Sequence, residues 1–235
     1  MDKNKITIAT HNGSFHADDI FAVAALLLVC EKKYNTVRAE EGSKETSKEM
    51  YKEIYNVEVI RSRDKEVLEK ATHVVDVGGV YNPSQNRFDH HQEGGAGVRE
   101  DGIPYASFGL VWKEYGKFLT GDAEIAEEID KRIVTPIDAA DNGLTVGNSL
   151  SEKKSQSEWF YNVKDMVFAY RATWKEDDMI MDKNFLYLTE VFKKILGREI
   201  SIIKDTKEGE KEVTVLLAIN KGKTLLIIDK HIPYE

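Results

Sequence analysis

Cysteine is almost absent from this 235-residue chain, and so are long apolar runs. The single cysteine, Cys30, excludes an internal disulfide framework and any Cys-x-x-Cys site, and a chain without disulfides suits a reducing compartment. The longest apolar run, residues 21–30, is much shorter than the roughly 20 residues that span a bilayer. We therefore expect a cytoplasmic protein without a membrane segment.

Several catalytic and nucleotide-binding motifs are also missing. The chain has no Gly-x-Ser-x-Gly elbow, which argues against a serine hydrolase, and neither of the usual glycine-rich phosphate loops. A basic excess is missing too, because the net charge is −8, whereas proteins that bind nucleic acid passively are normally basic. These absences favour an enzyme that attracts a polyanionic substrate through bound cations or a local basic strip.

Short strands and helices alternate in the first part of the chain. Residues 6–10, 36–40, 57–61 and 73–77 are strand candidates, and helices are expected from Asp18-Asp19 onward, at 44–55 and at 64–70. This alternation predicts an α/β fold with a mostly parallel sheet flanked by helices. Sites in such sheets gather at the carboxyl ends of the strands.

The later part of the chain is expected to be helical before a small β region. Helices are predicted at 106–119, 122–141 (interrupted by Pro136), 159–172 and 183–196, and strands at 200–204, 213–219 and 225–228. Residues 92–105 form a polar, glycine-rich loop, and residues 147–158 are a Ser-rich linker candidate. We expect a catalytic domain over residues 1–148, and a helical linker region with a small α/β C-terminal domain over residues 149–235.

One stretch, residues 73–92, holds the ionisable side chains that a site at such an edge needs. Asp76 lies near the end of the strand at 73–77, and two glycines break the strand directly after it. Beyond a turn at residues 82–84 stand Asp89, His90 and His91. Carboxylates bridge divalent cations and imidazoles complete their coordination, so the pattern predicts a metal site. The alternative is a surface turn that happens to contain histidines.

Three further segments offer ligands of the same kind. His11, His16 and Asp18 follow the first strand, and Asp138 and Asp141 end a helix on one face, three residues apart. A dinuclear site needs a bridging carboxylate and about three further ligands for each ion, and the four segments together supply that number. Taken singly, each residue has an ordinary alternative, such as a helix N-cap for Asp18.

Six segments between residues 10 and 143 recur in the same order in one known family. They are THNGSFHADD (10–19), IRSRD (60–64), VVDVGGVYNP (74–83), RFDHHQ (87–92), SFGLVWKEYG (107–116) and IDAADNG (137–143). With these segments the chain resembles the Myg (melanocyte-proliferating-gene) family, a branch of the DHH phosphoesterase superfamily. The first and fourth segments together are highly specific.

The resemblance implies a role for each of these residues around two divalent cations, Mn²⁺ or else Mg²⁺. Asp76 would bridge both ions, with His11 and His16 completing one shell. Asp18, His90 and either Asp138 or Asp141 would complete the other. His91 would face the substrate phosphate with Asp89 supporting it, so that Asp76, His90 and His91 form the catalytic group. His16 stands where many members of the superfamily have an aspartate, which leaves the preferred metal open.

The resemblance also implies an activity, namely 3′→5′ exonuclease action on RNA or single-stranded nucleic acid. Family members usually continue into a glycine-rich C-terminal segment that helps to hold substrate, and this sequence ends at Glu235, where that segment would begin. Two alternatives stay open: hydrolysis of a small phosphoester such as pyrophosphate, short oligonucleotides or a nucleotide, and a non-catalytic metal-stabilised interaction domain. Formation of a homo-oligomer is a further open expectation.

Overall fold

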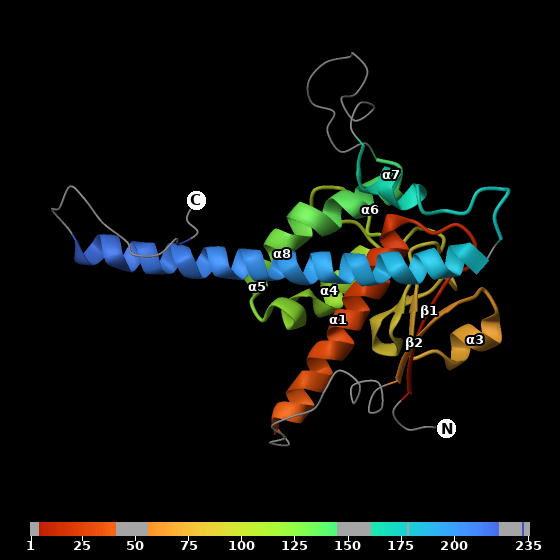
Figure 1. Ribbon diagram of the computed structural model, residues 1–235, viewed down its shortest axis with the longest axis horizontal. Coiled ribbons are helices and arrows are strands. Elements are labelled where there is room, and N and C mark those ends of the chain that lie inside the picture. The colour runs from red at the N-terminus through yellow and green to blue at the C-terminus, as the bar shows by residue number, and fades with distance from the viewer. Residues whose placement is uncertain (1–4, 41–55, 145–160, 178, 221–231, 233–235) are drawn as a thin grey trace, which may run out of the picture.

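A computed structural model describes residues 5–40, 56–144, 161–177, 179–220 and 232 (Figure 1). These residues form one five-stranded sheet, in the order β2-β1-β3-β5-β4. The strands are β1 (Lys5–Thr10), β2 (Asn56–Arg61), β3 (His73–Val75), β4 (Tyr81–Asn82) and β5 (Arg87–Phe88). Neighbouring strands are parallel except β4, which pairs antiparallel with β5 at the edge. The predicted α/β fold with a mostly parallel sheet is confirmed.

Helices surround this sheet and make up most of the remaining described residues. They are α1 (Ala17–Glu40), α3 (Lys65–Lys70), α4 (Ser107–Thr120), α5 (Ala123–Ile129), α6 (Thr135–Asp141), α7 (Val163–Phe168) and α8 (Met179–Ile219), with a 3₁₀ turn η1 (Pro83–Gln85) and a π turn η2 (Asp130–Val134). Within the described ranges, no helix is both long enough and apolar enough to cross a membrane.

Helix α1 lies at the centre of the core. Each of residues 20–26 is at most 2% exposed, because this stretch is apolar on every side and is stable only when neighbours surround it. Helices α4 and α8 are among those neighbours. The ring centroid of Phe21 lies 5.1 Å from that of Phe108 on α4 and 4.5 Å from that of Phe192 on α8. This packing fixes the amino end of α1, where Asp18 and Asp19 lie, against the sheet and α4.

The strand predicted at residues 36–40 is wrong, because these residues are the last turns of α1. The β-branched pair Thr36-Val37 suggested a strand, but no glycine or proline stops the helix between Ala17 and Glu40. The helix predicted at residues 44–55 lies outside the described residues. The strand predicted at 73–77 ends two residues early, at Val75, so that Asp76 follows the strand directly.

The strands predicted at residues 200–204 and 213–219 are also wrong, because both segments belong to the 41-residue helix α8. The helix packs against α1 and α5, and its C-terminal end extends past the other described elements (Figure 1). Leu196, Ile200 and Ile203 recur at helical spacing and are all buried, so tertiary burial outweighs the preference of the isoleucines for strands. The third predicted strand, 225–228, lies outside the described residues. The predicted C-terminal region is therefore helical where the structure describes it.

The long helix predicted at residues 122–141 exists in three parts, α5, η2 and α6. The interruption expected from Pro136 takes the form of a π turn, in which the Thr135 N–H donates to the carbonyl of Asp130. Proline lacks an N–H and its ring crowds the preceding turn, which explains the wider winding just before it. The interruption sets the direction of α6 and therefore of Asp138 and Asp141.

Candidate metal centre

Asp76 occupies a strained backbone position at the carboxyl end of β3. Its φ is +56°, a left-handed value that non-glycine residues rarely adopt. The peptide is held there by a hydrogen bond from the Asp76 N–H to the Phe88 carbonyl, 3.1 Å long. The next turn passes through Gly78 and Gly79, with φ of +98° and +67°, values open to glycine. Strain of this kind is typical of functional side chains, and it aims this carboxylate away from the strand.

His11 follows β1 and reaches the same place. Its Nδ1 lies 3.2 Å from the carbonyl of Asn12, and a hydrogen bond there leaves Nε2 with a free lone pair. That Nε2 lies 3.0 Å from Asp19 Oδ2 and 3.2 Å from Asp76 Oδ2. Asp19 also accepts the His16 N–H at 2.8 Å, a bond typical of a helix start. The local cap of α1 therefore fixes the loop that carries both histidines.

Asp18 does not cap its own helix but faces the amino end of α4. Its two carboxylate oxygens accept the backbone N–H groups of Ser107 and Phe108 at 2.9 and 2.7 Å. The Ser107 hydroxyl in turn donates to Asp76 Oδ1 at 3.2 Å. The unpaired N–H groups and the positive end of the α4 dipole thus stabilise two buried carboxylates. The sequence did not predict this role of Ser107.

The three residues of the Asp-His-His triplet, Asp89, His90 and His91, have different surroundings. Asp89 is 1% exposed and accepts the Gly79 N–H at 2.5 Å and His91 Nδ1 at 2.7 Å. The ring of His90 points inward, with Nε2 3.3 Å from both Asp76 Oδ1 and Asp141 Oδ2. The side chain of His91 is 61% exposed. Asp89 therefore supports His91 from behind while His90 joins the acidic cluster.

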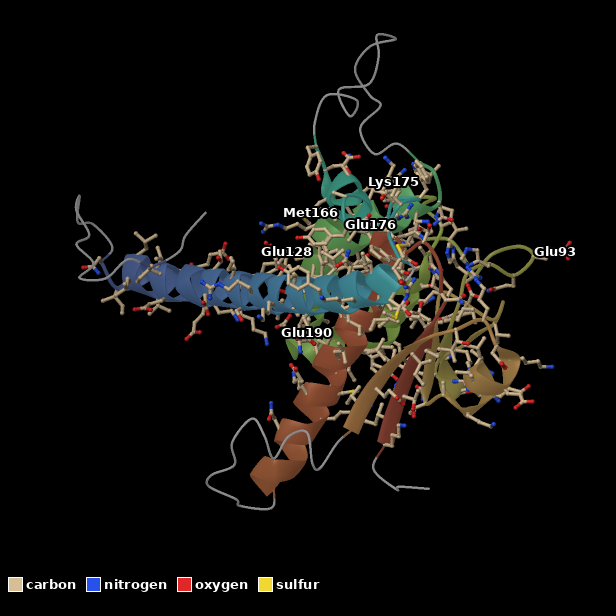
Figure 2. All side chains as sticks on the ribbon, turned by 45° about the vertical axis from the view of Figure 1, so that its right-hand side comes forward. Glu93, Glu128, Met166, Lys175, Glu176 and Glu190 are labelled. Atoms are coloured by element: carbon tan, nitrogen blue, oxygen red, sulfur yellow. The ribbon has the colours of Figure 1, made fainter. Side chains whose placement is uncertain are left out.

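Asp138 and Asp141, which the sequence could not separate, have different surroundings. Asp138 is fully buried, accepts the Gly109 N–H at 3.0 Å and pairs with Arg99 at 2.7 Å. Asp141 faces His90 and borders the pocket. The structure brings Asp141 into the cluster and gives Asp138 a cationic partner of its own. Arg99 belongs to the predicted loop 92–105, which it ties back to Asp138, whereas Glu93 of the same loop lies far out (Figure 2).

Three groups of side chains place one ligand atom each within 4.8 Å of one another. They are His11, His16 and Asp76; Asp76, His90 and His91; and Asp18, His90 and Asp141. The first and third groups match the two shells that the resemblance implies, and Asp76 lies 3.2–3.3 Å from a histidine of each. Nε2 of His90, a member of two of these groups, is buried without a hydrogen-bond partner among the described residues. Such an orphaned nitrogen fits a divalent cation.

Electrostatics also favour a cation at this place. Burial and the charges of Asp76 and Asp141 raise the pKa of Asp18 well above its usual value. Burial alone would lower the pKa of the two inner histidines, but the facing carboxylates raise the pKa of His11 to about 10 and that of His90 to about 11. The cluster thus concentrates negative charge that protons partly neutralise in the metal-free chain. A divalent cation would take over that neutralisation.

The cluster opens into a pocket of about 850 Å³. Seven of the predicted residues border it, namely His11, His16, Asp18, Asp76, Asp89, His91 and Asp141. Ser14, Arg63 and Lys164 complete its polar lining. Asp19, which the sequence analysis did not assign to the site, contacts His11 through its Oδ2. Its position three residues after His16 suits a helix cap, and this spacing is the sequence signal that could have indicated it.

Comparison with known proteins identifies the relatives of this chain. Residues 7–235 match the family described as Uncharacterised protein family (UPF0160), which carries the name MYG1 exonuclease. The chain belongs to this MYG1 family. The MYG1 protein of Dictyostelium discoideum is 34% identical over 98% of this chain, and the MYG1 exonuclease of Mus musculus is 33% identical over 76% of it. The predicted relationship to the Myg family is confirmed.

The chain matches only part of the length of each of these MYG1 relatives. The match covers 68% of the Dictyostelium protein, 45% of the mouse protein and 46% of the MYG1 protein of Chlamydia pneumoniae, which is 34% identical. No solved structure matches the chain. The geometry of the site therefore comes from the present structure.

Proposed function

We propose that this chain is a phosphodiesterase that uses two divalent cations, Mn²⁺ in preference to Mg²⁺, to release nucleotides from the 3′ end of RNA or single-stranded DNA. The observation that carries the proposal is the convergence of Asp and His side chains from four segments on Asp76. The name exonuclease, given to MYG1 proteins of rat, mouse and human, supports the choice of substrate. All proposed ligands lie within residues 1–148, in keeping with the predicted catalytic domain.

The residues present suit two neighbouring cations that share one carboxylate. His11, His16 and Asp76 would hold one, and Asp18, His90 and Asp141 the other, with Asp76 between them. When bound, the cations would neutralise charge on the phosphate and activate water at neutral pH. Asp138 is left out of this assignment because Arg99 and the Gly109 N–H already occupy its oxygens.

His91 is suited to bind the phosphate. Its Nδ1 is held by Asp89, so Nε2 is free to donate to a phosphate oxygen in the pocket. The facing carboxylate of Asp89 raises the pKa of His91, which favours the charged form of the imidazole. Hydrogen bonds that strengthen as charge develops on phosphorus would lower the barrier.

The proposed reaction consumes one water for each nucleotide released. The water oxygen forms a bond to phosphorus, the bond from phosphorus to the 3′ oxygen of the preceding nucleotide breaks, and that oxygen takes up a proton. The products are a nucleoside 5′-monophosphate and a strand shorter by one residue with a free 3′ hydroxyl. His91 would stabilise the phosphate during this change, and the carboxylates would hold the cations.

The test is Mn²⁺-dependent hydrolysis of a 5′-labelled single-stranded RNA, its DNA counterpart and inorganic pyrophosphate, by the wild type and by Asp76→Asn. Stepwise shortening from the 3′ end, lost in Asp76→Asn, is the expected result. Lys65→Gln is the control, since Lys65 is an exposed residue of α3 that pairs with Glu69 and is absent from the pocket lining. Full turnover by Asp76→Asn would refute the proposal. Cleavage of pyrophosphate alone would favour the small-substrate alternative, because the pocket is large enough to enclose such a molecule.

A further inference from the structure

Two cationic side chains border the pocket, and neither belongs to the acidic cluster. Arg63 follows β2 on the loop before α3, and Lys164 lies in the first turn of α7. The two elements α3 and α7 lie well apart in Figure 1, so the charges come from separate parts of the fold. Their position suits an anion that extends beyond the metal ligands.

The backbone around Arg63 is fixed, although its side chain is exposed. The Ser62 N–H donates to the Thr10 carbonyl at 2.7 Å, which extends the pairing of β1 with β2 to the edge where His11 begins. The Asp64 N–H donates to Ser62 Oγ at 3.0 Å, and Asp64 is engaged as the cap of α3. Among the described residues, no hydrogen bond or ion pair engages the guanidinium of Arg63. A free guanidinium on a fixed loop is suited to bind a phosphate through two hydrogen bonds.

The other rim combines a cation with an aromatic ring. Lys164 Nζ lies 5.4 Å from the ring centroid of Phe168, which is 37% exposed and borders the pocket. The guanidinium of Arg171 stacks on this ring, 3.7 Å from its centroid, and also donates to the carbonyl of Phe15 in the loop between His11 and His16. The ring is therefore held in place beside the proposed metal site. Aromatic rings in such positions stack on bases, and lysines beside them bind the backbone phosphates.

From this arrangement we infer that Arg63 and Lys164 bind two successive backbone phosphates of the substrate strand, and that Phe168 stacks on a base. The inference rests on the proposed function and defines its substrate class. It assigns to the pocket a strand of at least two nucleotides, since a lone pyrophosphate would fill the metal site without reaching both rims. Phosphate contacts of this kind position a strand without reading its sequence.

The test compares charge-removing variants with matched controls. Arg63→Gln and Lys164→Gln each remove a rim charge, and Lys65→Gln and Lys175→Gln remove a charge of the same sign nearby. Lys65 and Lys175 are absent from the pocket lining, and Lys175 is labelled in Figure 2. Binding of a labelled single-stranded RNA with phosphorothioate linkages is measured by fluorescence anisotropy at several salt concentrations in Mn²⁺, beside turnover of the normal RNA and a direct Mn²⁺ titration.

Each rim variant should weaken RNA binding and raise KM about tenfold, as for a hydrogen bond to a charged group. It should also reduce the slope of log Kd against log salt by about 0.7, while kcat and Mn²⁺ affinity stay unchanged. The controls should match the wild type, and Phe168→Ala should weaken binding without changing the salt slope.

Unchanged binding in both rim variants, with normal turnover, would overturn the inference and leave the proposed function standing. If the wild type binds RNA in a salt-dependent way but does not cleave it, and Arg63→Gln weakens this binding, the inference is supported and the proposed function is overturned. A wild type that neither binds nor cleaves would overturn both.

Discussion

Gly109 should be the most sensitive glycine of α4, because it lets the helix approach the buried acid of α6. A Cβ at this position would lie 1.8 Å from Oδ2 of Asp138 and 2.8 Å from a guanidinium nitrogen of Arg99. Both partners are almost fully buried and paired with each other. Gly109→Ala must therefore displace the Asp138 carboxylate, together with the hydrogen bond that it accepts from the Gly109 N–H.

The size of the effect follows from two opposing contributions. Breaking a buried ion pair costs about 3–5 kcal/mol, and alanine in place of glycine inside a helix regains about 1 kcal/mol. The free energy of unfolding should thus fall by about 2–4 kcal/mol. For a chain of this length, that change lowers Tm by roughly 5–15 °C.

Urea and thermal unfolding measure this directly, and Gly197→Ala is the matched control. Gly197 is also a helix residue, in α8, but a Cβ there would meet only Leu28 Cδ2 at 3.7 Å, an ordinary contact. Gly197→Ala should therefore leave the protein as stable as the wild type or more stable by up to about 1 kcal/mol. The reasoning is refuted if Gly109→Ala unfolds at the urea concentration of the wild type, or if both variants lose the same stability.

Three further predictions concern metal and pH. Mn²⁺ at a hundred times its Kd should raise the free energy of unfolding by about 2.7 kcal/mol, and an unchanged Tm in Mn²⁺ would contradict a cation site. Arg171→Gln removes the donor to the Phe15 carbonyl and should weaken Mn²⁺ binding about tenfold in a calorimetric titration. Arg171→Lys should recover part of this affinity. Equal Mn²⁺ affinities of the wild type and the variants would show that this contact does not position the loop. Burial, with the charges of Lys33 and Arg87, lowers the pKa of His73 from 6.5 to about 4. The unfolded chain therefore binds this proton at a higher pH than the folded chain, so between pH 7 and pH 4 the stability should fall by about 3 kcal/mol more in the wild type than in His73→Phe. Parallel urea titrations of the two proteins would contradict this.

The convergence of the Asp and His residues in the candidate site could largely be predicted from sequence because most of them follow strand ends. His11, Asp76 and the Asp-His-His triplet come directly after β1, β3 and β5, respectively, and a parallel sheet brings such ends to one edge. The choice between Asp138 and Asp141 could not be made, since both lie on one face of α6. It depends on Arg99, a partner distant in sequence whose contact only the folded chain creates.

The errors in the fold arise where a local preference for strands does not decide the structure. The isoleucines at 200, 202 and 203 favour strands by themselves, yet the apolar face of α8 that includes Phe192 and Leu196 continues through Ile200 and Ile203 into the same core. The end of α1 has a different reason, since the helix continues through Thr36 in the absence of a stop signal. Burial against a distant element decides the case of α8, and a short window of sequence contains no information about it.

The most direct test of the account is the number of Mn²⁺ ions bound per chain, measured by equilibrium dialysis for the wild type and Asp76→Asn. Because the carboxylate of Asp76 lies 3.2–3.3 Å from His11 and His90, which belong to different ligand groups, it should serve both ions. We expect two ions bound tightly by the wild type and loss of tight binding at both sites in Asp76→Asn. No binding by the wild type, or equal binding by the two proteins, would contradict it.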